Sequence, residues 1–221
     1  MNGEGRLKEI LTAPGLSLMI QEVLYGFIMS LIFVYATRFG LLHYNSTTDF
    51  LLVVTGMNVT WGAIDGIVFY FLGVCDQKRY TKIISDHSVD RETRVRILMD
   101  EFSATPLDVM SDEDLRIVCE KMLDRELQSE EKNRKDRRAM ALSSVGCFLI
   151  TVLTLIPIAL PILLIEDFMS ALMVSTFLSS IILFFIGYEI APYLGTRRLT
   201  TGLLLLGISM SLAVISVFTG G

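Results

Sequence analysis

Residues 139–165 read AMALSSVGCFLITVLTLIPIALPILLI and contain no charged side chain. A helix needs about 20 mostly apolar residues to cross about 30 Å of hydrocarbon, and this stretch is long enough to do so. Pro157 and Pro161 lie late in it, and proline lacks a backbone donor and clashes with the preceding turn. The stretch therefore predicts a membrane-spanning helix with a kink near its prolines.

Four further apolar stretches occur at residues 16–36, 50–74, 168–188 and 199–218. Because lipid offers the backbone no hydrogen-bond partner, each of them is expected to be a helix. Only Glu166 and Asp167 separate the third stretch from the fourth, which predicts a tight turn between two antiparallel neighbours. The sequence thus predicts an all-α integral membrane protein built as a five-helix bundle.

Charged residues are concentrated in the middle of the 221-residue chain, whose formal net charge is -5. Of the 19 basic residues, 14 lie within residues 78–138, and of the 24 acidic residues, 16 lie within residues 76–136. Both signs are mixed there, so the segment is not the basic surface that nucleic acid requires. The predicted parts are a leader (1–15), spans one and two (16–74), a cytoplasmic helical domain (75–138) and spans three to five (139–221).

The orientation follows from the basic residues, which favour the cytoplasmic side of a membrane. Arg6 and Lys8 precede the first span, the charged domain follows the second, and Arg197 and Arg198 lie between the fourth and fifth. With five spans, all three basic segments fall on one side. This predicts a multi-pass protein with a cytoplasmic N-terminus and an outer or luminal C-terminus. It would lie in the cell membrane of a prokaryote, or otherwise in an organelle membrane.

Periodic apolar residues predict helices in the charged domain. One face of residues 90–102 carries Val95, Leu98, Met99 and Phe102. A second helix is expected to begin at Ser111, whose spacing to Asp114 is typical of a capping box. Its apolar stripe contains Leu115, Val118, Met122 and Leu123. A third, highly charged stretch at 129–138 is expected to continue into the third span.

Asp65 is the most informative residue, because it lies inside the second apolar stretch. A carboxylate at the centre of a bilayer costs at least about 2.5 kcal/mol, so it should face the bundle interior or a water-filled cavity. Thr55, Asn58 and Gly62 precede it at helical spacing, and Gly62 with Gly66 forms a GxxxG motif that lets another helix approach closely. One interpretation is a cation or proton path lined by Asn58 and Asp65. The other is a hydrogen-bonded aspartate that only holds helices together.

Glu22 lies early in the first span, next to Gln21. It is expected either to line the entrance of a path or to face lipid headgroups as an interfacial carboxylate. Met29 and Met57 could offer thioether ligands to a transition metal, or could be ordinary apolar residues of the spans.

Three acids of the charged domain, Glu113, Glu120 and Asp124, follow one another at helical-turn spacing. Carboxylates so spaced can share a divalent cation. Lys121 and Arg125 alternate with them, so a solvated helix face also explains the pattern. Motifs of hydrolases, metalloproteases and nucleotide-binding proteins are absent from the sequence, which therefore predicts neither an enzyme nor a tightly bound cofactor.

The layout of two spans, a charged helical domain and three spans resembles the vacuolar iron transporter family. Local sequences carry the same resemblance: QEVLYG at 21–26, DQKR at 76–79, PIALP at 157–161, and GTRR at 195–198 followed by Gly202 and Gly207. The chain departs from the family in two places. Met29 stands about where the family has an aspartate in its first helix, and the charged domain lacks the family's dense glutamate repeats.

The resemblance implies a homodimer that moves Fe²⁺, sometimes Mn²⁺, out of the cytosol in exchange for protons. On this hypothesis Asp65 binds cation and proton in turn, with Asn58, Met57 or Met29 as neutral ligands. Glu22 lines the entrance, and the acids of the charged domain recruit the transported metal. The alternative is a non-transporting membrane scaffold whose charged domain binds a partner protein. It is motivated by the missing first-helix aspartate and by the amphipathic faces around Val95 and Leu115.

Overall fold

The computed structural model describes residues 3–86, 88–103, 105–124 and 130–219, and every regular element within them is a helix. The longest helix is α3 (Thr47–Ser85), and α2 (Gly15–Arg38) and α6 (Glu130–Leu153) follow it with equal length. The prediction of an all-α fold is therefore confirmed for the described residues. The leader contains α1 (Gly3–Thr12), a helix that is not predicted from the sequence.

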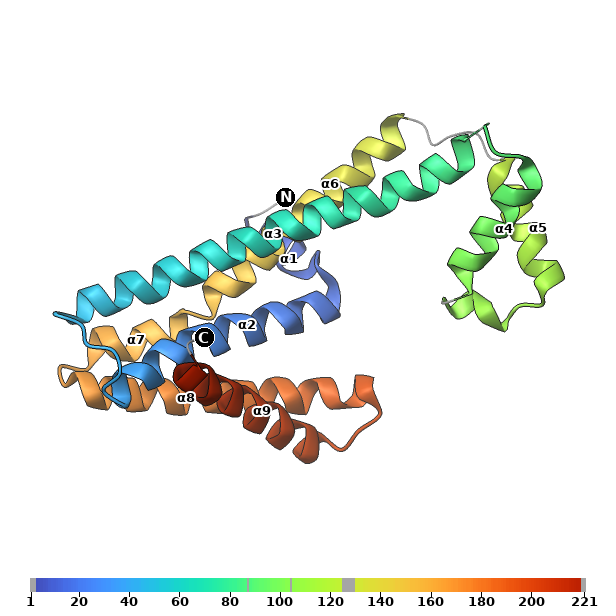
Figure 1. Cartoon of the computed structure of the whole chain (residues 1–221). Coiled ribbons are helices and arrows are strands. Elements are labelled where there is room, and N and C mark those ends of the chain that lie inside the picture. The colour runs from blue at the N-terminus through green and yellow to red at the C-terminus, as the bar shows by residue number, and fades with distance from the viewer. Residues whose placement is uncertain (1–2, 87, 104, 125–129, 220–221) are drawn as a thin grey trace. The chain divides into compact units, whose positions relative to one another are not determined.

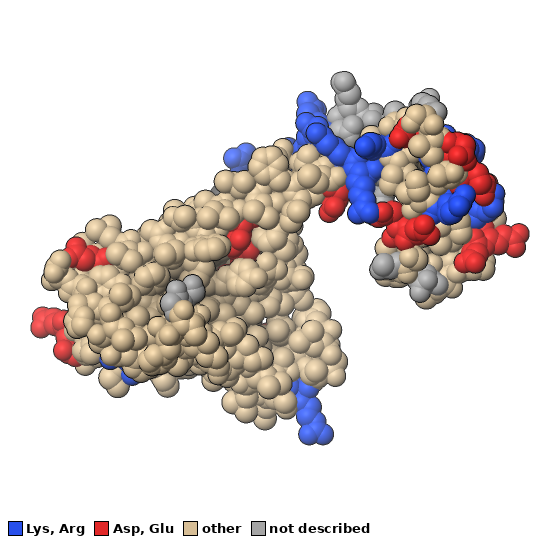
Figure 2. Space-filling view, viewed as in Figure 1, with Lys and Arg blue, Asp and Glu red and all other residues tan. Residues whose placement is uncertain are grey.

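The chain divides into two compact units. Unit 1 contains Met1–Val68 and Leu142–Gly221, and unit 2 contains Phe69–Ala141. Charged side chains gather on unit 2, whereas the face of unit 1 visible in Figure 2 carries few of them. Unit 2 is slightly wider than the domain predicted at 75–138, because α3 and α6 each continue as one helix across its boundaries.

Five helices are long and apolar enough to cross a membrane, as the hydropathy of the sequence predicts. They are α2 (Gly15–Arg38), α3, α6 with α7 (Ile156–Leu164), α8 (Phe168–Ile190) with the 3-10 helix η2 (Ala191–Leu194), and α9 (Arg198–Thr219) (Figure 1). Their apolar composition suits them to a solvent in which only internally hydrogen-bonded backbone is stable.

The third span is broken at its prolines. α6 ends at Leu153 and α7 begins at Ile156, with Pro157 in the first turn of α7 and Pro161 inside it. Proline is tolerated in a first helical turn because the backbone N–H it lacks has no partner there. The predicted kink is therefore confirmed as a break at Thr154 and Leu155.

A tight turn joins α7 to α8, and the two helices pack against each other. Asp167 caps α8, because its carboxylate accepts a hydrogen bond of 2.8 Å from the backbone N–H of Ser170. The hydroxyl of Ser175 on α8 also donates to the Ile158 carbonyl on α7 at 2.8 Å. The predicted neighbours are thus held together by a capped turn and by a buried polar contact.

The core of unit 1 draws buried apolar side chains from every candidate span. Its most buried members include Leu31, Phe50, Ile158, Leu172 and Ala213. α8 and α9 approach most closely at two glycines: a Cβ on Gly187 would lie 2.8 Å from the Cα of Gly202. Only glycine fits such a crossing, where two helix backbones touch.

Unit 2 contains its own small core between α4 (Arg91–Phe102) and α5 (Asp112–Leu123), which are joined through the 3-10 helix η1 (Pro106–Val109). The predicted face of α4 is confirmed, because Val95 and Leu98 are buried against α5. The predicted stripe of α5 is partly wrong. Cys119, one turn after Leu115, is fully buried, whereas Val118 and Met122 are only partly covered.

Side-chain caps begin both helices of this core. The carboxylate of Asp90 accepts a hydrogen bond of 2.8 Å from the backbone N–H of Thr93, and hydrogen bonds from Thr93 lower the pKa of Asp90. The hydroxyl of Ser111 accepts from the backbone N–H of Asp114 at 3.2 Å, which confirms the predicted helix start. Residue 129, where the third charged stretch was expected to begin, lies outside the described residues; from Glu130 the helix continues into the third span as expected.

Candidate cation path

Polar side chains from three helices meet inside the otherwise apolar unit 1. We call this set the polar seam: Glu22 and Ser30 of α2, Asn58 and Asp65 of α3, and Cys147 and Thr151 of α6. Glu22, Gly26 and Ser30 follow one another at four-residue spacing, which places them on one face of α2. Asp65 is half-buried, and the other five members of the seam are buried.

Glu22 is fully enclosed within the bundle, with 0% of its surface exposed. The Thr151 hydroxyl donates a hydrogen bond to Glu22 Oε2, whereas Oε1 is buried without a partner. The interpretation of Glu22 as an interfacial carboxylate facing headgroups is therefore wrong. The residue lies early in its helix, but its side chain points toward α6 rather than outward.

Asn58 offers a second unused oxygen in the seam. Its amide nitrogen donates to Ser30 Oγ at 2.7 Å and to the Val54 carbonyl at 3.1 Å, which fixes which way the amide faces. Its Oδ1 is buried and has no hydrogen-bond partner. A buried acceptor left unpaired is costly, so this oxygen is available to a ligand that brings a positive charge or a donor.

Asp65 lies within electrostatic range of Glu22 and Cys147. Within the part of the chain that the structure describes, Asp65 makes no hydrogen bond or ion pair. The interpretation of Asp65 as a hydrogen-bonded residue that holds helices together finds no partner among these residues.

The GxxxG motif beside Asp65 packs against α6. A Cβ on Gly66 would lie 2.9 Å from the Ser144 carbonyl oxygen, and one on Gly62 would lie 3.2 Å from Thr151 Cβ. The predicted close approach of another helix is therefore confirmed, and the helix belongs to the same chain. Thr55 is exposed, so it does not share the buried face of Asn58 and Gly62 that the helical spacing predicts.

Two of the proposed neutral ligands, Asn58 and Met57, lie too far along α3 to share one ion with Asp65. Asn58 lies seven positions before Asp65 and Met57 lies eight positions before it, which corresponds to about 10–12 Å along a helix. Met29 and Met57 are both partly buried. If these groups act on one ion, they do so as successive positions along the seam rather than as one coordination sphere.

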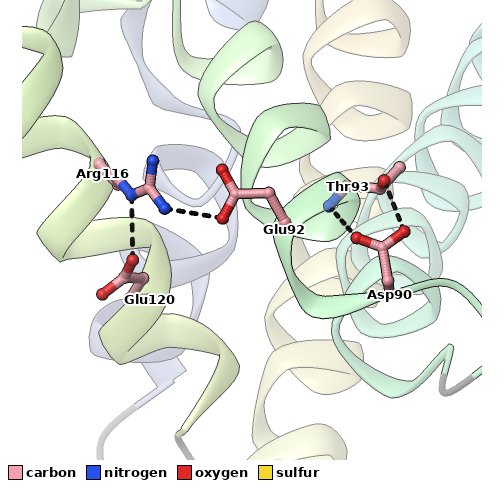
Figure 3. A network of polar contacts seen from close by, with 5 residues as sticks. All are labelled: Asp90, Glu92, Thr93, Arg116 and Glu120. Carbon is pink, nitrogen blue, oxygen red and sulfur yellow. Dashed lines mark hydrogen bonds and ion pairs between the residues drawn. The ribbon is translucent and has the colours of Figure 1, made fainter.

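Two of the three candidate acids of unit 2, Glu120 and Asp124, form ion pairs with arginines. Asp124 pairs with Arg91 at 2.7 Å, and this guanidinium lowers the pKa of Asp124. Arg116 lies between Glu92 and Glu120, with N–O distances of 2.7 and 3.1 Å (Figure 3). Glu113 is exposed on α5, the helix that also carries Arg116 and Glu120.

This pairing explains the acidic pattern of α5 as a solvated, charge-balanced face. Among the described residues, no three His, Cys, Asp or Glu side chains come together so that they could hold a metal ion. The structure therefore does not assemble Glu113, Glu120 and Asp124 into a metal-recruiting cluster.

Sequence reasoning did not identify Ser30, Cys147 and Thr151 as members of the site. Their signal is weak, because small polar residues are common in apolar helices. The only cue is spacing: Cys147 and Thr151 lie four residues apart, as do Glu22, Gly26 and Ser30. Which faces meet depends on helix packing, which the periodicity of one helix does not reveal.

Comparisons of the chain with models of protein families, with curated proteins and with solved structures found no match. The fold and the seam define the class of the molecule: over the described residues it is an all-helical protein with five helices long and apolar enough to cross a membrane, and with one buried and one half-buried acid among them.

Proposed function

We propose that this chain is a divalent transition-metal transporter, a divergent member of the vacuolar iron transporter family. It would move Fe²⁺ or Mn²⁺ out of the cytosol in exchange for protons. The observation that carries this proposal is the acid pair Glu22 and Asp65, held inside an apolar bundle with no basic partner among the described residues. An uncompensated charge is expensive in lipid, so acids retained there are expected to bind an exchangeable cation or proton.

The proposed orientation rests on the basic residues at three sites. Arg6 and Lys8 lie in α1, the basic residues of unit 2 follow α3, and Arg197 and Arg198 lie at the start of α9. If the five candidate spans cross a bilayer, these segments share one side, which the positive-inside rule makes cytoplasmic. The N-terminus and unit 2 would then face the cytosol, and the C-terminus would lie outside or in a lumen.

In the proposed mechanism Asp65 binds the metal and releases it when a proton arrives. Asn58 Oδ1 and the Met57 thioether would receive the ion at successive positions along the seam. Fe²⁺ and Mn²⁺ accept carboxylate and carbonyl oxygen, and Fe²⁺ also tolerates sulfur. Glu22 would line the path on the cytoplasmic side, as the resemblance implies.

The proposed homodimer rests on the resemblance alone. Gly62 and Gly66 pack against α6 of the same chain, so they offer no surface to a second copy. One of the two observations behind the scaffold alternative no longer supports it. The apolar faces around Val95 and Leu115, which would bind a partner protein, pack against each other.

Metal flux into vesicles tests the proposal. We expect acid-loaded proteoliposomes to accumulate Mn²⁺ from a neutral medium several-fold faster than protein-free vesicles, and we expect a protonophore to abolish the difference. Potassium flux under the same gradient is the control, and it should equal that of protein-free vesicles. Mn²⁺ and Fe²⁺ uptake no faster than in protein-free vesicles would reject the transporter assignment.

A further inference from the structure

The Thr151 hydroxyl faces two acceptors but has one proton to donate. Its Oγ1 lies 2.5 Å from Glu22 Oε2 and 3.1 Å from the carbonyl oxygen of Cys147. A hydroxyl donates one hydrogen bond and accepts up to two. When Thr151 donates to Cys147, the short contact with Glu22 is therefore a hydrogen bond only if Glu22 carries a proton and donates it.

We propose that Glu22, Thr151 and the Cys147 carbonyl form a proton-binding site in which the Thr151 hydroxyl reverses direction as the proton arrives. In the ionised state the Thr151 hydroxyl donates to the Glu22 carboxylate. In the protonated state the Glu22 carboxyl donates to Thr151 Oγ1, and the Thr151 hydroxyl turns to the Cys147 carbonyl. One proton enters, Glu22 loses one negative charge, and both states keep the contact between Glu22 and Thr151.

The surroundings favour a proton over a fixed cation as the partner of Glu22. The titratable groups within electrostatic range of it are Asp65 of α3 and the Cys147 thiol of α6, and neither can supply a positive charge. No Lys or Arg pairs with Glu22 in the described parts of the chain. A buried carboxylate with one donor and no cation is costly, and protonation relieves that cost.

Thr151 is held so that this reversal needs only a rotation of its O–H bond. Both γ atoms of threonine restrict its side-chain rotamer on a helix, where Oγ1 commonly bonds the carbonyl one turn back. The one-turn-back carbonyl is that of Cys147. The packing of Gly62 near Thr151 Cβ further limits the space into which the side chain could turn.

The proton-binding site deepens the proposed function. It rests on that function only for the claim that the bound proton is exchanged for metal. If the chain exchanges metal for protons, Glu22 gives the proton a second binding site, in addition to Asp65, which binds metal and proton in turn. The site itself requires no metal.

Infrared difference spectroscopy on the full-length protein in lipid vesicles tests the site directly, in metal-free buffer across a pH titration. We expect a carboxyl band from a buried protonated acid that Glu22→Gln removes. Thr151→Val should shift the midpoint of that band by about one unit to higher pH, because a hydrogen bond to a charged group is stronger than one to a neutral group. Thr151→Ser keeps the hydroxyl, so the midpoint of its carboxyl band should equal that of the parent protein.

Thr55→Val is the matched control, because Thr55 is exposed on α3 and the change is chemically the same. A carboxyl band that survives Glu22→Gln unchanged, or a midpoint that moves equally in Thr151→Val and Thr55→Val, would overturn the proposal. Metal flux is measured separately on the same preparations. An intact Glu22 band in a protein without flux would reject the transporter and leave the proton site standing.

Discussion

Asp65→Asn is expected to reduce metal flux through reconstituted protein by about 10- to 100-fold, the loss that corresponds to removing the charge that would pair with the metal ion. The substitution keeps the size and polarity of the side chain and removes only its charge. Asp65 is the half-buried acid of the polar seam, and it has no partner in the described residues that would give it a purely structural role. Initial rates of Mn²⁺ uptake measure the effect.

The thermal stability of Asp65→Asn should not fall with its metal flux, so a stable variant without flux has lost transport rather than its fold. Because an uncompensated carboxylate is unfavourable in an apolar bundle, Asp65→Asn should unfold at the same or a higher temperature than the parent. Asp49→Asn, near the first turn of the same helix, is the control and should leave flux unchanged. Parental flux in Asp65→Asn would remove the residue from the transport mechanism.

Gly26→Ala is expected to destabilise the bundle by about 1–3 kcal/mol, the usual cost of overpacking a core. A Cβ at this position would lie 2.2 Å from Thr154 Oγ1, 2.9 Å from its Cγ2 and 3.0 Å from the Thr151 carbonyl oxygen. Threonine is stiff on a helix, so neither γ atom of Thr154 can yield without the other taking its place. The strain is relieved only if α2 moves away from α6.

Such a movement would also separate Glu22, which lies one turn before Gly26 on α2, from Thr151, which lies three residues before Thr154. We therefore expect Gly26→Ala to lower the thermal midpoint in detergent and to weaken the Glu22 carboxyl band. Gly56→Ala is the matched control, because a Cβ on Gly56 meets nothing within 4 Å. Alanine is the better helix former, so this control should be neutral or stabilising. Equal behaviour of the two variants would contradict the close packing of α2 on α6.

The helices could be predicted because each depends on local sequence. The uncharged stretch 139–165 and its four companions are long enough to span a bilayer, and five suitable helices occur in the structure. Pro157 accounts for the break in the third span, and Ser111 begins α5 as its side chain dictates. Each of these features is set by a few neighbouring residues, so one sequence is enough to reveal it.

The candidate site could be predicted only in part, because it depends on which helix faces meet. Asp65 and Asn58 stand out as polar residues in an apolar span. Thr151 does not, because its importance comes from its contact with Glu22 across the bundle. Glu120 and Asp124 have the spacing of a cation site, but arginines of unit 2 neutralise them, and Arg91, the partner of Asp124, lies on α4, distant in sequence.

The most direct test of the account is the access of water to position 65. It uses Asp65→Cys in a chain whose Cys75, Cys119 and Cys147 are replaced by alanine, with Ile64→Cys as the control because Ile64 is exposed on the apolar outer surface of α3. We expect a hydrophilic, membrane-impermeant thiol reagent to modify Asp65→Cys in lipid vesicles much faster than Ile64→Cys. Modification of Asp65→Cys no faster than Ile64→Cys would show that position 65 faces acyl chains or a dry interior, and would contradict a cation path through the polar seam.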